Sequence, residues 1–212
     1  MTNTTHPNRR PIQARSSQWA QQAATRLAGS RISANQISVA SMAFAGAGAL
    51  CLVGPPGPVG TAGLVGCALA IQGRLICNLL DGMVAVEGGR KSPLGALYNE
   101  FPDRVADSLL IVALGYAIGL PALGWFAALA AALTAYVRAY GGALGLPQDF
   151  RGPMAKQHRM AVMTIGCLLG AAEGASTGTA YALTLAAALI AAGSVLTCVT
   201  RTLAIAARLQ AT

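Results

Sequence analysis

The sequence predicts an all-α membrane protein: a six-transmembrane-helix bundle with an N-terminal amphipathic helix at the membrane interface. Three observations support this fold class. Of the 212 residues, 54% are hydrophobic and only 10% are charged, whereas soluble domains carry about 25% charged residues. Apolar runs recur along the chain at lengths close to the roughly 20 residues that a helix needs to cross a bilayer. Basic residues gather between alternate pairs of these runs.

The apolar runs set the domain organisation. The six runs lie at 36–54, 60–85, 103–120, 122–145, 159–175 and 180–206. Residues 1–15 are polar and contain two prolines, so we expect a disordered tail. Residues 16–31 mix alanine and leucine with glutamine and arginine, which is typical of an amphipathic helix on a membrane surface or of a solvated lead-in. Residues 32–212 then form one membrane domain, and Ser33 or Asn35 is expected to cap its first helix.

The placement of basic residues predicts the topology. The net charge is +8, but the loops at 54–58, 119–121 and 173–179 contain neither lysine nor arginine. Loops on the cytoplasmic side of a membrane carry the excess of positive charge. We therefore expect a multi-pass protein of the bacterial-type inner (cytoplasmic) membrane, with both termini in the cytoplasm. The basic residues are placed as the topology in a lipid bilayer requires, so we expect the bilayer and not a nucleic acid as their partner.

An acidic cluster marks the candidate site. Five of the seven acidic residues lie between Asp81 and Asp107, and carboxylates inside a membrane are costly enough to indicate function. Asn78 and Asp81 share a face of the second run, and Asp103 and Asp107 share a face of the third. Two adjacent helices can direct these oxygen ligands at one or two Mg²⁺ or Mn²⁺ ions. The alternative is a polar contact between helices without metal.

Two neighbours of the cluster are candidates for substrate binding. Gly82 leaves room beside Asp81 for a phosphate to approach the backbone. Arg74 lies inside the second run, one helical turn before Asn78, where an unpaired arginine is costly. It either contacts the substrate or neutralises Asp81 or Asp107 as a structural pair.

A basic segment from Arg138 to Arg159 is the second candidate feature. Arg138 and Lys156 are expected to bind a phosphate group on the acceptor substrate, if the acceptor has one. The alternative is that the segment sets the topology and attracts anionic lipid.

Small residues in the apolar runs are expected to serve packing. Gly166, Gly170 and Gly174 repeat every four residues, a spacing that lets helices approach closely. The five cysteines all lie in apolar runs without a Cys-x-x-Cys pair, so we expect packing residues rather than a disulfide framework.

The acidic cluster resembles the motif of the CDP-alcohol phosphotransferases, Asp-x-x-Asp-Gly-x-x-Ala-Arg, eight residues, then Gly-x-x-x-Asp-x-x-x-Asp. The matching residues are Asp81-Gly82-x-x-Ala85 and the aspartates downstream. The segment 33–38 is also similar to the Thr-Pro-Asn-x-Ile-Thr that opens the first span in that family. Two positions depart from the pattern, because Asn78 replaces the first aspartate and Val86 replaces the arginine.

The downstream half of the motif aligns in two registers. Strict spacing matches Gly95, Asn99 and Asp103, whereas a shift of one turn matches Asp103 and Asp107. Two observations favour the shifted register. Proline fits the first turn of a helix, so Pro102 predicts a helix that begins there. The segment 103–110 also resembles the family's Asp-Pro-x-Ala-Asp-Lys-Leu-Leu. The resemblance then implies that Asp103 is a metal ligand and Asp107 the general base. Gly95 and Asn99 are expected beside the substrate.

The resemblance implies an enzyme of phospholipid synthesis. A divalent-metal-dependent site facing the cytoplasm would move a phosphatidyl group from a CDP-linked lipid donor, CDP-diacylglycerol, to an alcohol acceptor with release of CMP. Ala85 would lie against the substrate, and the chain would form a homodimer. The changes at Asn78 and Val86 favour the alternative, a non-catalytic divalent-cation-binding membrane protein or transporter. No internal repeat of the kind typical of transporters is visible.

Overall fold

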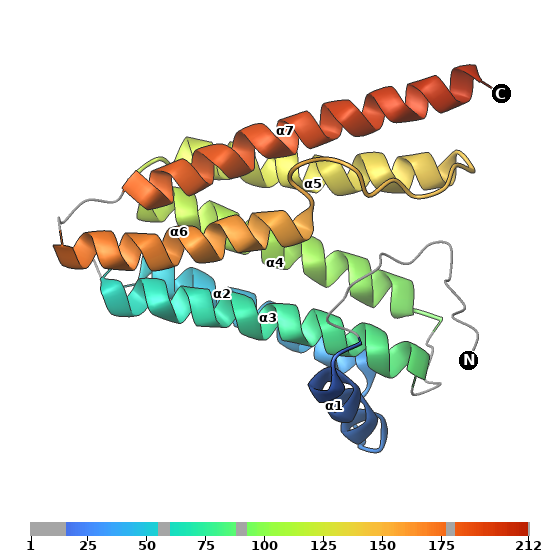
Figure 1. Cartoon of the computed structure of the whole chain (residues 1–212), viewed down its shortest axis with the longest axis horizontal. Coiled ribbons are helices and arrows are strands. Elements are labelled where there is room, and N and C mark those ends of the chain that lie inside the picture. The colour runs from blue at the N-terminus through green and yellow to red at the C-terminus, as the bar shows by residue number, and fades with distance from the viewer. Residues whose placement is uncertain (1–15, 55–59, 88–92, 177–180, 212) are drawn as a thin grey trace.

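The computed structural model describes residues 16–54, 60–87, 93–176 and 181–211, and every regular element among them is a helix. The predicted tail 1–15 lies outside the described residues. In Figure 1, α2 to α7 run side by side along one direction, and α1 projects from one end. The helices are α1 (Gln18–Ala28), α2 (Ala34–Val53), α3 (Thr61–Glu87), α4 (Gly95–Ala117), α5 (Pro121–Ala143), α6 (Lys156–Ser176) and α7 (Tyr181–Gln210).

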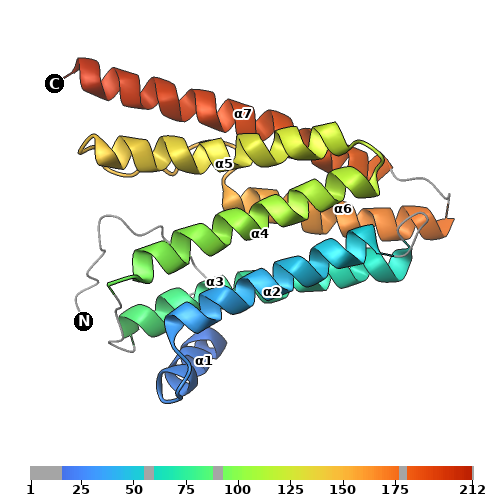
Figure 2. The same cartoon turned by 180° about the vertical axis from the view of Figure 1, so that it is seen from behind.

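The six long helices close into a ring. α2 packs against α3 and α4, α5 against α4 and α7, and α6 against α3 and α7. Their inner faces form one apolar core, which includes Ile71, Leu110, Leu114, Met163 and Ile190. Consecutive long helices run in opposite directions (Figure 2), so α2 and α4 begin at the end of the ring where α3, α5 and α7 finish, and α6 runs in the same direction as α2 and α4.

The outer surface is that of a membrane protein. Leu50, Leu69, Trp125 and Leu185 are each more than half exposed, and lipid solvates such side chains as well as a protein core does. Within the described ranges, α2, α3, α5 and α7 are long and apolar enough to cross a membrane. α4 and α6 have 23 and 21 residues, which is also long enough, but they carry the charges of the acidic and basic segments.

The start of α2 is capped as predicted. Ser33 Oγ accepts a hydrogen bond from Gln36 N at 3.2 Å, and Gln36 Oε1 accepts one from Ser33 N at 2.8 Å. This reciprocal pair satisfies two backbone donors that the helix leaves free. Before it, α1 lies within the predicted 16–31 and buries Ala20 and Ala24 against α3. The position of α1 on a membrane surface stays a prediction.

The predicted start of the third long helix was wrong. α4 begins at Gly95 rather than near residue 103, and Pro102 lies inside it. Proline there removes one backbone donor and crowds the carbonyl of Tyr98. Packing and charge outweigh that local cost, because Pro102 is buried and Glu100 ion-pairs with Arg138 at 2.7 Å. The argument from Pro102 for the shifted motif register therefore fails.

Two of the three glycines predicted to pack closely do so. A Cβ added to Gly166 would lie 2.7 Å from Ala186 Cβ, and one added to Gly170 would lie 3.1 Å from Leu183 Cγ. A Cβ at Gly174 would meet nothing within 4 Å, so that part of the prediction was wrong. All five cysteines are free, as expected for packing residues.

The crossing of α4 and α5 depends on glycine. A Cβ added to Gly115 would lie 2.5 Å from Gly124 Cα, and backbone atoms cannot swing aside as side chains do. We expect Gly115→Ala to lower the free energy of unfolding by about 1–3 kcal/mol. Gly46→Ala is the matched control, because an added Cβ there meets nothing within 4 Å. Thermal unfolding in one detergent measures both variants, and equal midpoints would contradict this packing.

Candidate active site

A cavity of about 900 Å³ opens toward the end of the ring where α2 and α4 begin, and all seven helices contribute residues to its lining. Its size is at the upper end of the range for small-molecule sites. In Figure 1 the segment between α5 and α6 runs back alongside α5, so that α6 begins part-way along the bundle. The first residues of α6 are thereby brought to the cavity.

One face of α3 supplies the first group of polar residues. Asn78, Asp81, Gly82 and Ala85 all line the cavity, as their helical spacing predicted. Asp81 is 4% exposed, and its Oδ2 accepts a hydrogen bond of 2.6 Å from Ser38 Oγ on α2. Its Oδ1 is buried and accepts no hydrogen bond from any described side chain. Asp81 therefore presents one oxygen that still lacks a side-chain partner.

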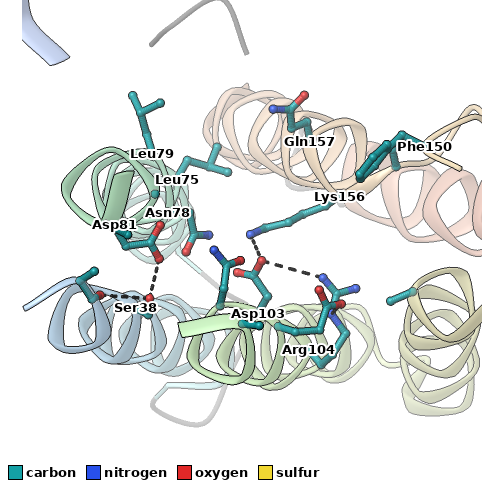
Figure 3. Close-up of a pocket in the computed structure, with 18 of the residues that line it drawn as sticks. Ser38, Leu75, Asn78, Leu79, Asp81, Asp103, Arg104, Phe150, Lys156 and Gln157 are labelled. Atoms are coloured by element: carbon teal, nitrogen blue, oxygen red, sulfur yellow. Dashed lines mark hydrogen bonds and ion pairs between the residues drawn. The ribbon is translucent and has the colours of Figure 1, made fainter. Parts of the chain in front are cut away.

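The facing side of α4 supplies the second group. Gly95, Asn99 and Asp103 line the same cavity. Lys156 Nζ pairs with Asp103 Oδ2, which also lies 3.9 Å from Arg104 Nη2. Figure 3 shows Asn78 between the two aspartates and Lys156 reaching across to Asp103. Asp103 thus has cationic partners where Asp81 has a hydroxyl.

Asp107 lies one turn further along α4 and outside the cavity lining. Its Oδ1 is 2.7 Å from Arg74 Nη2, and its Oδ2 is 2.9 Å from Arg159 Nη2. Arg74 is fully buried, does not line the cavity, and also lies 3.4 Å from Asp103 Oδ1. Of the two partners predicted for Arg74, the structure therefore selects Asp107 and not Asp81.

The side of the cavity opposite α3 is basic. Arg138, predicted from the sequence, lines it and bonds both Glu100 oxygens, at 2.7 and 2.8 Å, and Gln148 Oε1 at 2.7 Å. Arg201 on α7 also lines it and donates to the Thr134 carbonyl at 2.6 Å. Among described lining residues, five are basic (Arg104, Arg138, Lys156, Arg159 and Arg201) and three are acidic (Asp81, Glu100 and Asp103).

The sequence reading missed three features of this cavity: Ser38, Arg201, and Glu100 as the partner of Arg138. Arg201 had a signal, because an arginine within an apolar run indicates function or a buried partner. Ser38 closes the segment 33–38 that resembles a family motif, but its bond to Asp81 joins distant segments and could not be predicted from that resemblance.

The segment between α5 and α6 is anchored to the ring. Gly152 has φ of 114°, and a Cβ there would lie 2.5 Å from Thr197 Cγ2, so only glycine fits. Met154 N donates to Thr197 Oγ1 at 2.9 Å. Hydrogen bonds from Arg151 lower the pKa of Asp149 below its usual value, which keeps this pair charged at neutral pH. The contacts of Gly152 and Met154 with Thr197 fix the point at which α6 begins.

The cavity is lined by oxygen donors of the kind that bind divalent cations. Asn78, Asp81, Asn99 and Asp103 line the cavity, which gives two carboxylates and two amides. Among the described residues, no group of three or more acidic, histidine or cysteine side chains converges. The buried Oδ1 of Asp81 and the buried Nδ2 of Asn78 both lack hydrogen-bond partners. Turning that amide would offer its carbonyl oxygen instead, so this pair fits one hard cation.

Sequence comparison finds relatives that share part of their length with this chain, although no family model matches. The bifunctional IPC transferase and DIPP synthase of Rubrobacter xylanophilus is 38% identical over 154 residues, 70% of this chain and 34% of that protein. The archaetidylinositol phosphate synthase of Aeropyrum pernix is 38% identical over 99 residues, 46% of this chain and 50% of that protein. The chain thus spans a third to a half of these relatives.

Solved structures share the fold. Mycobacterium tuberculosis phosphatidylinositol phosphate synthase with CDP-DAG bound has a TM-score of 0.73 and 21% identity, covering 89% of this chain and 94% of that one. Its complex with manganese and citrate has a TM-score of 0.71 and 22% identity, covering 88% of each chain. The cavity-lining motif residues, the two partial relatives and the shared ring of helices agree on one point: this chain resembles the CDP-alcohol phosphotransferase family.

Proposed function

We propose that this protein is a membrane transferase that moves a phosphatidyl group from a CDP-linked lipid, CDP-diacylglycerol, to an alcohol, releasing CMP. The observation that carries the proposal is the cavity, where motif residues of α3 and α4 face basic residues of α5, α6 and α7. A neighbour of the same fold binds CDP-DAG, and a diphosphate suits a lining with more cations than anions.

The reaction divides among a few side chains. The acceptor hydroxyl attacks the lipid-side phosphorus, a new P–O bond forms, and the bond to the bridging oxygen breaks so that its electrons leave on CMP. Asp103 takes the hydroxyl proton, because it lines the cavity and Asp107 does not. Lys156 and Arg138 bind phosphate oxygens. A neighbour holds manganese, and a Mg²⁺ or Mn²⁺ ion held by Asp81 and Asn78 would polarise the phosphorus.

The basic side of the cavity favours an acceptor that itself carries a phosphate. Glu100 pairs with Arg138 and Asp107 pairs with Arg159. Arg201 lines the same side and donates to neutral backbone carbonyls, so a second anionic group is accommodated there. Two similar proteins carry inositol phosphate in their names. We therefore propose a phosphorylated polyol, with inositol phosphate as the first to test.

The membrane topology completes the proposal. α4 and α6 would join the four apolar helices as spans, because the ring in Figure 1 aligns all six. Both termini and the cavity would then face the cytoplasm of an inner-membrane protein, with α1 lying at the interface. The homodimer implied by the family stays a prediction.

Release of CMP tests this function. Purified full-length protein with Mn²⁺ and CDP-diacylglycerol should release CMP when inositol phosphate is added, and much less with inositol or glycerol, because the basic side chains then lack their anion. The measurement is chromatographic quantification of CMP across a panel of acceptors. No release with any acceptor, together with saturable divalent-ion flux into proteoliposomes, would favour the transporter alternative.

A further inference from the structure

The two carboxylates on the cavity floor differ in how their charge is balanced. Asp103 contacts three cationic side chains, Lys156, Arg104 and Arg74. Asp81 forms no ion pair with any described side chain, and its hydrogen-bond partner is the neutral Ser38 hydroxyl. A buried carboxylate without a cationic partner is strongly disfavoured. Among the described residues, the charge of Asp81 is therefore left for a bound cation to balance, whereas that of Asp103 is already balanced.

The surroundings of Asp81 fit a metal ion. Asp81 is 4% exposed and lines the cavity, where its Oδ1 has no side-chain partner. The Asn78 amide, also without a partner on its nitrogen, lies beside it in Figure 3. A carboxylate oxygen and an amide oxygen are hard donors that suit Mg²⁺ or Mn²⁺, with water or phosphate completing the shell.

The surroundings of Asp103 oppose a second ion. The next oxygen donor along α4 is Asn99, a neutral amide. A divalent cation at Asp103 would face Lys156 and Arg104 on Oδ2 and Arg74 on Oδ1, all of like sign at short range. The Lys156 ammonium is a compact point charge with three donors, and α6 begins at this residue, which fixes its backbone in the cavity wall.

We propose that this cavity binds one divalent cation, at Asp81 and Asn78, and that the Lys156 ammonium replaces a second cation at Asp103. The role of Lys156 toward the donor rests on the proposed function: Lys156 holds the donor's diphosphate from the side opposite the metal. Each chain would then bind one divalent ion, whereas a two-ion site binds two.

Counting bound Mn²⁺ tests the proposal. Mn²⁺ is titrated into the purified full chain in nanodiscs without donor, and free Mn²⁺ is measured by electron paramagnetic resonance. We expect one ion per chain in the wild type and in Lys156→Gln, and none in Asp81→Asn. Asn99→Asp combined with Lys156→Gln restores a carboxylate and removes the ammonium, and should bind two.

Several results overturn this inference. The inference fails if the wild type binds two Mn²⁺ ions or none, or if Asp81→Asn binds Mn²⁺ as well as the wild type does. It also fails if the double variant binds one ion while its thermal unfolding matches that of the wild type. The wild-type count decides even where a variant fails to fold. Because the titration contains no donor, it is independent of catalysis. One bound ion without CMP release refutes the proposed function only. CMP release with two bound ions refutes this inference only.

Discussion

Replacing Asp81 by asparagine should reduce CMP release by ~100-fold or more, the loss typical when one preorganised electrostatic contact to the reacting group is removed. Asp81 is buried in the cavity wall, and its Oδ1 is the carboxylate oxygen there without a described side-chain partner. Asparagine keeps the shape and can still bond Ser38, so the fold should survive. The loss should therefore come from the missing charge.

The control for Asp81 is the same substitution outside the cavity. Asp149→Asn removes a carboxylate that bonds Arg151 at 2.6 Å and does not line the cavity, and we expect it to release CMP nearly as fast as the wild type. Initial rates at saturating Mn²⁺ and donor measure both variants. An Asp81→Asn enzyme as active as Asp149→Asn would remove Asp81 from the site.

Replacing Asp107 by leucine should destabilise the protein by about 3–5 kcal/mol, the cost of leaving buried charge without its partner. Asp107 is the anion between Arg74 and Arg159, at 2.7 and 2.9 Å, and both arginines are at most 1% exposed. These contacts join α3, α4 and α6 below the cavity. Thermal unfolding in a fixed detergent measures the loss.

A compensated variant separates charge from packing at Asp107. Replacing Asp107 by leucine together with Arg74→Met and Arg159→Met removes Asp107 and both of its cationic partners, and apolar replacement of buried ion pairs is often neutral or stabilising. Asp103 then keeps Lys156 and Arg104 as partners. We expect this triple variant to unfold at a higher temperature than Asp107→Leu alone. If Asp107→Asn instead unfolds like the wild type and loses only CMP release, that result supports Asp107 as the general base in place of Asp103.

The comparison of α3 and α4 explains what the sequence predicted well and badly. On α3, the spacing of Asn78, Asp81 and Ala85 predicted a common face, and all three line the cavity. On α4, Pro102 gave a misleading local signal, because burial and the Glu100 ion pair outweigh the proline's cost to the helix. Local propensity decides helix ends only where tertiary contacts are weak.

The sequence alone determined that this is a helical membrane protein with a cluster of carboxylates on two consecutive helices. Apolar run length and side-chain periodicity are properties of short segments, so they can be read without knowing the packing. Only the tertiary structure decided that Asp107 is held between Arg74 and Arg159, that Lys156 reaches Asp103, and that Asp81 bonds Ser38. These pairs join segments far apart in the chain, and Coulomb energy depends on distance in space, which sequence spacing does not give.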